Sequence, residues 1–151
     1  MVWWTRSYLG GNLIVVGAAA RNRIRRLYLD ENLTSLRMSN ECPDAGTHQL
    51  PPEERYVEVL SGPDLGQRIA SESLELAVVE KVHDAVRGTT VIFCVGHRGD
   101  TTWAAAEYLA RNWRSLRREF GEAPFAVCLG FRDPGYGYEY HPPRRLLAIR
   151  G

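Results

Sequence analysis

The sequence predicts a single α/β domain with a mainly parallel sheet, an antiparallel C-terminal edge and helices on its flanks. Short apolar runs over residues 12–17 and 89–95 are typical of buried strands. Each run is followed by a turn containing glycine and then by apolar residues at helical spacing, which indicates strand-turn-helix units. A length of 151 residues is enough for one hydrophobic core, and no repeat or linker divides the chain.

The individual elements follow from the spacing of apolar residues. Strands are expected where β-branched and apolar residues run together or alternate, over residues 12–17, 34–38, 56–60, 89–95, 125–131 and 145–150. Helices are expected over residues 18–29 and 101–120, and Gly121 ends the second one. Residues 39–52 are rich in Asn, Pro, Asp and Gly, which predicts a surface loop.

Residues 71–87 fit two different structures. Leu74, Val78 and Val82 keep a helical period, and Gly88 is a suitable residue to end a helix. The continuous apolar run over residues 74–79 also fits a buried strand that is followed by a polar turn. We expect the strand, paired with residues 89–95.

Composition indicates which partners and which cellular compartment to expect for the protein. The net charge of +1 gives no reason to expect nucleic acid or a membrane surface as a partner. No apolar run approaches the length of a transmembrane helix, and the N-terminus lacks the pattern of a signal peptide. The three cysteines are odd in number, widely spaced and not in a metal-binding pattern, so we expect a reducing cytoplasm, no metal and no cofactor.

The strongest candidate for a ligand site is the loop over residues 96–102, with the sequence GHRGDTT, between a strand and the longest helix. Glycines let backbone N–H groups approach a ligand, and a helix N-terminus attracts anions. The basic and hydroxyl side chains offer further donors. The ligand-binding residues expected in this loop are Gly96, His97, Arg98, Gly99, Thr101 and Thr102. The alternative is a plain strand-to-helix turn, with Asp100 as the helix cap.

A second candidate turn follows the first strand. Gly17 ends that strand, and Arg21 and Asn22 lie at the start of the next helix. In a parallel sheet both turns lie at the carboxyl edge, where open α/β sheets bind ligands. The sequence therefore predicts an anionic ligand between the two turns. The alternative is a solvated helix face whose alanines pack against the sheet.

Cys94 suggests a different class of function. A cysteine at the end of a strand, before a loop and a helix, is the arrangement of rhodaneses and cysteine phosphatases. Here Cys94 comes two residues early, and Asp100 stands where a phosphatase has its arginine. We therefore expect Cys94 to be part of the core, with the cysteine enzyme as an alternative function.

The chain also resembles a group of small, uncharacterised bacterial Rossmann-like domains. The resemblance rests on the strand, small-residue turn and Asn22 near the N-terminus, and on the later pattern of a strand followed by Gly-x-x-Gly and Thr-x-x-Ala-Ala over residues 91–106. It covers most of the chain through loosely specified motifs. It implies a Rossmann-like fold akin to the nucleotide-sensing domains of bacterial signalling and conflict systems, and it implies no particular activity.

We therefore expect the protein to bind a nucleotide-like or phosphorylated small molecule, with sensing or hydrolysis as the consequence and no catalytic residue assigned. The second alternative to this function, beside the cysteine enzyme, is an interaction module. In that case the tryptophans Trp3, Trp4, Trp103 and Trp113 pack on a protein partner or on a second copy of the chain.

Overall fold

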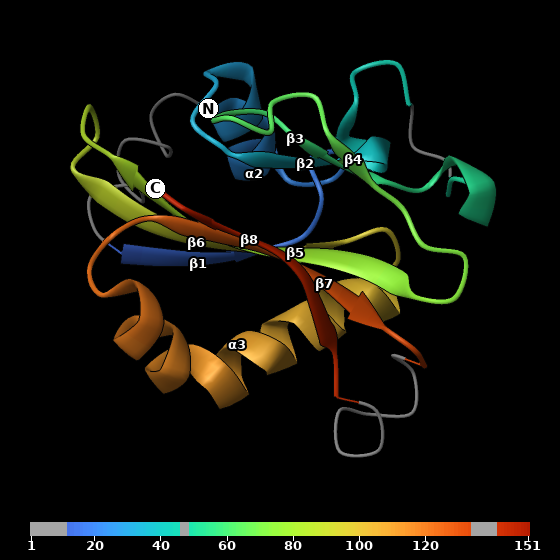
Figure 1. Ribbon diagram of the computed structural model, residues 1–151. Helices are drawn as coiled ribbons and strands as arrows, with labels where there is room; N and C mark the ends of the chain where they lie inside the picture. Colours follow the sequence, from blue (N-terminus) through green and yellow to red (C-terminus); the bar gives the residue numbers. More distant parts are fainter. Residues whose placement is uncertain (1–11, 46–48, 134–141) are drawn as a thin grey trace.

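The computed structural model describes residues 12–45, 49–133 and 142–151, which form three layers. A five-stranded sheet forms the middle layer. Helix α3 (Gly99–Phe120) covers one face of this sheet (Figure 1). Helix α2 (Arg23–Asp30) and a separate three-stranded sheet cover the other face. Each face of the central sheet is therefore buried under a different kind of layer.

The central sheet is mainly antiparallel. Its strands, in spatial order, are β1 (Asn12–Val16), β6 (Thr89–Gly96), β5 (Glu75–Asp84), β7 (Phe125–Phe131) and β8 (Arg144–Arg150). Strands β1 and β6 are parallel, whereas β6 with β5, β5 with β7 and β7 with β8 are antiparallel. The prediction of a mainly parallel, Rossmann-like sheet is therefore wrong, although the antiparallel C-terminal edge is present.

The order of the elements along the chain explains why the sheet is mainly antiparallel. A tight turn that ends at Gly88, with φ of 63°, joins β5 directly to β6, so these strands form a hairpin instead of a parallel pair. Helix α3 then crosses over β5 and returns the chain to β7 on the far side of the hairpin. The strand expected over residues 74–79 is confirmed as part of β5, and the helical alternative is wrong.

A separate three-stranded sheet lies on the same side of the central sheet as α2. Its strands β2 (Leu36–Met38), β3 (Val57–Val59) and β4 (Arg68–Ile69) are antiparallel. Two short 3₁₀ helices, η1 (Ser39–Glu41) and η2 (Pro52–Glu54), lie between β2 and β3. The prediction of a surface loop is wrong for η1, because Ser39 and Glu41 are buried.

Alternating side chains of the central sheet fill two halves of the core. On the side of α2, apolar residues such as Val78 and Phe93 pack against Tyr28 of the helix and against the small sheet. On the side of α3, residues such as Val79 and Cys94 pack against the buried face of that helix. The predicted helix over residues 101–120 is confirmed and begins two residues earlier, and Gly121 ends it with φ of 64°.

Candidate ligand-binding pocket

The parallel pairing of β1 with β6 brings the two predicted turns to the same end of the sheet. Val16 pairs with Cys94, and the amide of Gly17 donates to the carbonyl of Cys94 at 3.0 Å. A pocket of about 370 Å³ opens between the turns. It is lined by Val16, Gly17, Ala18, Ala20, Arg21, Asn40, Gln49, Gly96, His97, Arg98, Gly99, Thr102 and Trp103.

Most of the predicted ligand-binding residues meet at this pocket. The structure brings together Gly17, Arg21, Gly96, His97, Arg98, Gly99 and Thr102 in its wall. Asn22 and Thr101 do not line the pocket. Both of these side chains are instead engaged at the start of a helix.

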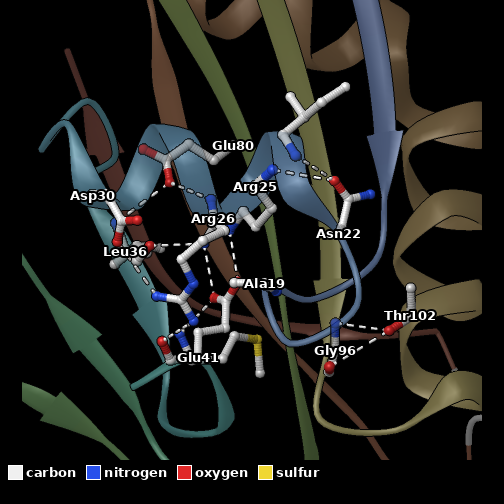
Figure 2. Close-up of polar contacts among 12 residues, drawn as sticks. Ala19, Asn22, Arg25, Arg26, Asp30, Leu36, Glu41, Glu80, Gly96 and Thr102 are labelled. Carbon is white, nitrogen blue, oxygen red and sulfur yellow. Dashed lines mark hydrogen bonds and ion pairs between the residues drawn. The ribbon is translucent and has the colours of Figure 1, made fainter. Parts of the chain in front are cut away.

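Asn22 is the N-cap of α2. Its side-chain Oδ1 accepts hydrogen bonds from the amides of Ile24 and Arg25, each at 3.1 Å (Figure 2). The cap explains why α2 begins at Arg23 and not at residue 18, where the apolar spacing predicts a start. Because Asn22 already satisfies the amides at this end of α2, the N-terminus of α2 offers less to an anion than the sequence predicts.

The N-terminus of α3 is more open. Arg98 is its N-cap residue and makes no side-chain capping hydrogen bond. Asp100 turns back onto the helix instead, where its Oδ1 accepts from the amide of Thr101 at 2.8 Å. Thr101 is fully buried. The positive end of the α3 dipole therefore meets the pocket at Arg98 and Gly99.

Gly96 and Gly99 differ in what surrounds them. A side chain on Gly96 would lie 2.5 Å from the backbone nitrogen of Thr102, because the first turn of α3 packs directly on it. The amide of Gly96 also donates to Thr102 Oγ1 at 3.0 Å (Figure 2). No atom of the described residues lies within 4 Å of a side chain built on Gly99. The fold therefore requires glycine at 96, whereas the space beside Gly99 is free for a ligand.

His97 forms part of the pocket wall as a neutral side chain. Burial, together with the charge of Arg55, lowers its pKa to about 4. Its Nε2 lies 2.9 Å from Ser39 Oγ, which also accepts from the amide of Tyr56. The direction of this hydrogen bond depends on the tautomer of the ring. The other ring nitrogen, Nδ1, is buried and has no hydrogen-bond partner among the described residues.

The charge of the pocket is positive. Arg21 and Arg98 are exposed, and no carboxylate is among the described residues that line the pocket. Arg98 forms an ion pair with Asp100, whose Oδ1 lies 3.5 Å from Arg98 Nε. Both of these side chains are solvated, so this pair leaves the guanidinium available to an anion.

Six lining residues are absent from the predicted site, namely Val16, Ala18, Ala20, Asn40, Gln49 and Trp103. Asn40 and Gln49 belong to the segment that the sequence predicts as a surface loop, and folding of η1 brings Asn40 to the pocket. Trp103 contacts a protein partner only in the alternative function, and in the structure it lines the pocket from the first turns of α3. Its position three residues after Asp100 on a helix was the signal that places it near the glycine loop.

A buried cluster of charged side chains, formed by Arg25, Glu41 and Glu80, holds together the segments that line the pocket. Glu41 receives hydrogen bonds from Arg25 Nε at 2.8 Å, from the amide of Ala19 at 3.1 Å and from the amide of Met38 at 3.0 Å (Figure 2). Ala19 lies in the Gly17 turn, and Glu41 follows Asn40 directly. One carboxylate therefore joins the Gly17 turn, α2 and η1.

Glu80 lies on the other side of Arg25. Its Oε1 is 3.7 Å from Arg25 Nη1, and its Oε2 accepts from the amide of Ser35 at 2.5 Å. Burial raises the pKa of the Glu80 carboxyl to about 7, although the charge of Arg25 opposes this rise. Glu80 is therefore a carboxyl group of the core that titrates near neutral pH.

The remaining candidates for chemistry lie outside the pocket. Cys94 is fully buried, and burial raises the pKa of its thiol to about 12. The expectation that Cys94 is part of the core is confirmed. A cysteine enzyme needs an accessible thiolate, and Cys94 does not provide one. In the described part of the chain no group of His, Cys, Asp and Glu residues is arranged to hold a metal.

Among the described residues, no helix is both long and apolar enough to span a membrane.

The chain was compared with family models, curated proteins and solved structures, and it matches none of them. The resemblance to bacterial Rossmann-like domains therefore stays a hypothesis.

Proposed function

We propose that the protein binds a phosphorylated small molecule in the pocket between the Gly17 turn and the residue 96–102 loop. The observation that carries this proposal is the set of groups around the pocket. Two exposed arginines and the open N-terminus of α3 face it, and no carboxylate is among the described lining residues. A phosphate group is stabilised by all of these features.

The same groups favour binding over hydrolysis. A general base works best with a pKa near the operating pH, whereas the pKa of His97 is about 4. The thiol of Cys94 is buried, and the described part of the pocket wall has no carboxylate. The proposal is therefore a binding or sensing domain.

Thermal unfolding with added pyrophosphate tests this function. A ligand at 100 times its Kd adds about 2.7 kcal/mol to the free energy of unfolding, which raises the Tm by several degrees. Replacing Arg98 with alanine should weaken binding roughly 10- to 150-fold, as expected for a charged hydrogen bond. Arg118→Ala is the matched control, because Arg118 is an exposed arginine near the other end of α3.

A Tm that pyrophosphate and nucleotides leave unchanged contradicts the proposal. Equal losses of affinity in Arg98→Ala and Arg118→Ala would also contradict it, because they would indicate a general effect of charge and no defined site.

A protein partner is the second candidate, and it has a specific observation in its favour. Ile14 of β1 and Trp113 of α3 are 65% and 47% exposed, and Trp103 is 72% exposed. Exposed aromatic residues commonly anchor interfaces. Trp3 and Trp4 lie outside the described residues. Sedimentation at increasing protein concentration tests self-association, and a monomer at every concentration would remove a second copy of the chain as the partner.

A further inference from the structure

Trp103 adds an aromatic surface to a pocket that also contains two arginines. Its side chain is 72% exposed and lines the same pocket as Arg21 and Arg98. A tryptophan that is this exposed gives up most of the burial that usually stabilises it. Val16 and Ala18 of the β1 end of the pocket are apolar as well. The pocket therefore combines an apolar, aromatic part with a cationic part.

This combination fits a ligand that is itself divided into two parts. A nucleotide has a flat aromatic base and an anionic phosphate, joined by a sugar. Stacking on an aromatic side chain stabilises any base, because every base has a π face. The amide side chains of Asn40 and Gln49 lie in the same wall, and amides offer both donors and acceptors to the edge of a base.

The pocket is also large enough. Its volume of about 370 Å³ lies within the range of roughly 300–1,000 Å³ that is usual for small-molecule sites. An isolated phosphate would leave most of that space empty, and it would leave Trp103 exposed. A nucleoside phosphate uses both parts of the pocket.

We infer that the ligand is a nucleotide whose base stacks on Trp103 while its phosphate lies at Arg98 and the N-terminus of α3. This inference rests on the proposed function, because the phosphate position is the same. It adds the aromatic base as the second group that the pocket recognises.

Isothermal titration with matched probes tests the inference. The probes are the four common nucleoside 5′-monophosphates and ribose 5-phosphate, which has the sugar and phosphate but no base. At least one monophosphate should bind more tightly than ribose 5-phosphate by roughly 5- to 150-fold, which is the range for stacking of one base on an aromatic residue.

Three variants test whether Trp103 is the source of the tighter binding of the monophosphate. Trp103→Ala should abolish the advantage of the monophosphate and leave the affinity for ribose 5-phosphate unchanged. Trp103→Phe should retain much of the advantage, because phenylalanine still offers a ring. Trp113→Ala, on the same helix but outside the pocket, should retain all of it. Because Trp103 is exposed, these variants should fold as the wild type does.

The outcomes separate the two proposals. If ribose 5-phosphate binds and no monophosphate binds more tightly, or if Trp103→Ala keeps the advantage, the base-stacking inference is overturned and the phosphate site stands. If neither ribose 5-phosphate nor any monophosphate binds, the proposed function fails and the inference fails with it.

Discussion

Glu41 shows how a single buried side chain determines the shape of the pocket. It holds the Gly17 turn through Ala19 and it neutralises Arg25. It also belongs to η1, which carries Asn40 to the pocket wall. No pattern in the sequence indicates this role, because the partners of Glu41 are up to 22 residues away and two of them are backbone amides. For the same reason, the composition of residues 39–52 predicts that Glu41 lies in a surface loop.

Replacing Glu41 with glutamine should destabilise the protein by about 3–5 kcal/mol, because the charge of Arg25 then stays buried without its closest partner. Denaturation with urea measures this change in the free energy of unfolding. Glu53→Gln, at an exposed position in η2, is the control and should change the free energy by less than about 0.5 kcal/mol. Equal effects in both variants would show that Glu41 does not hold the cluster together.

Glu80 should make stability depend on pH in the opposite sense to most carboxylates. Its pKa is about 7 in the folded protein and 4.5 as the reference value. Between these values the folded state binds a proton that the unfolded chain has released. Stability therefore falls as the pH rises through this window, by up to about 3 kcal/mol.

Glu80→Gln removes this titration and leaves the other titrating groups in place. Relative to the wild type, the variant should gain up to about 3 kcal/mol of stability between pH 4.5 and pH 8, measured by urea unfolding at each pH. A difference between the two proteins that stays constant across this range would contradict the raised pKa of Glu80.

At the scale of elements, apolar patterning predicts where strands and helices lie better than it predicts how they pair. The strand over residues 125–131 and the helix that ends before Gly121 are confirmed. The direction of β5 depends on the short turn at Gly88, which makes β5 and β6 an antiparallel hairpin in a sheet that was expected to be mainly parallel. The two-residue strand β4 is too short to leave an apolar pattern, and the sequence did not predict it.

The two glycines at the start of α3 should respond differently to alanine. Gly96→Ala should cost about 1–3 kcal/mol of stability, because the new methyl group meets the backbone of the first turn of α3. Gly99→Ala should leave stability within about 0.5 kcal/mol and should weaken the binding of pyrophosphate, because the methyl group occupies free space beside the pocket. Urea unfolding and calorimetry measure the two effects. Unchanged binding in Gly99→Ala would place the phosphate away from the start of α3.

At the scale of the whole molecule, one parallel pair is enough to build the pocket. The sequence predicts a mainly parallel sheet, and this prediction is wrong. It also predicts that the two glycine turns lie at one edge of the sheet, and this arrangement depends only on the parallel pairing of β1 with β6. Much of the pocket wall is therefore predictable from the sequence even though the predicted fold is wrong. Asn40 and Gln49 are not predictable in this way, because their positions depend on how the small sheet packs on the central one.

The most direct test of the account is the map of amide chemical shifts as pyrophosphate is titrated into ¹⁵N-labelled protein. We expect the largest changes at Gly17, Gly96 and Gly99, which line the pocket, while Gly62, Gly88 and Gly121 lie outside it and stay unchanged. No change at the three pocket glycines, or larger changes at the three remote ones, would contradict the claim that this pocket binds phosphate.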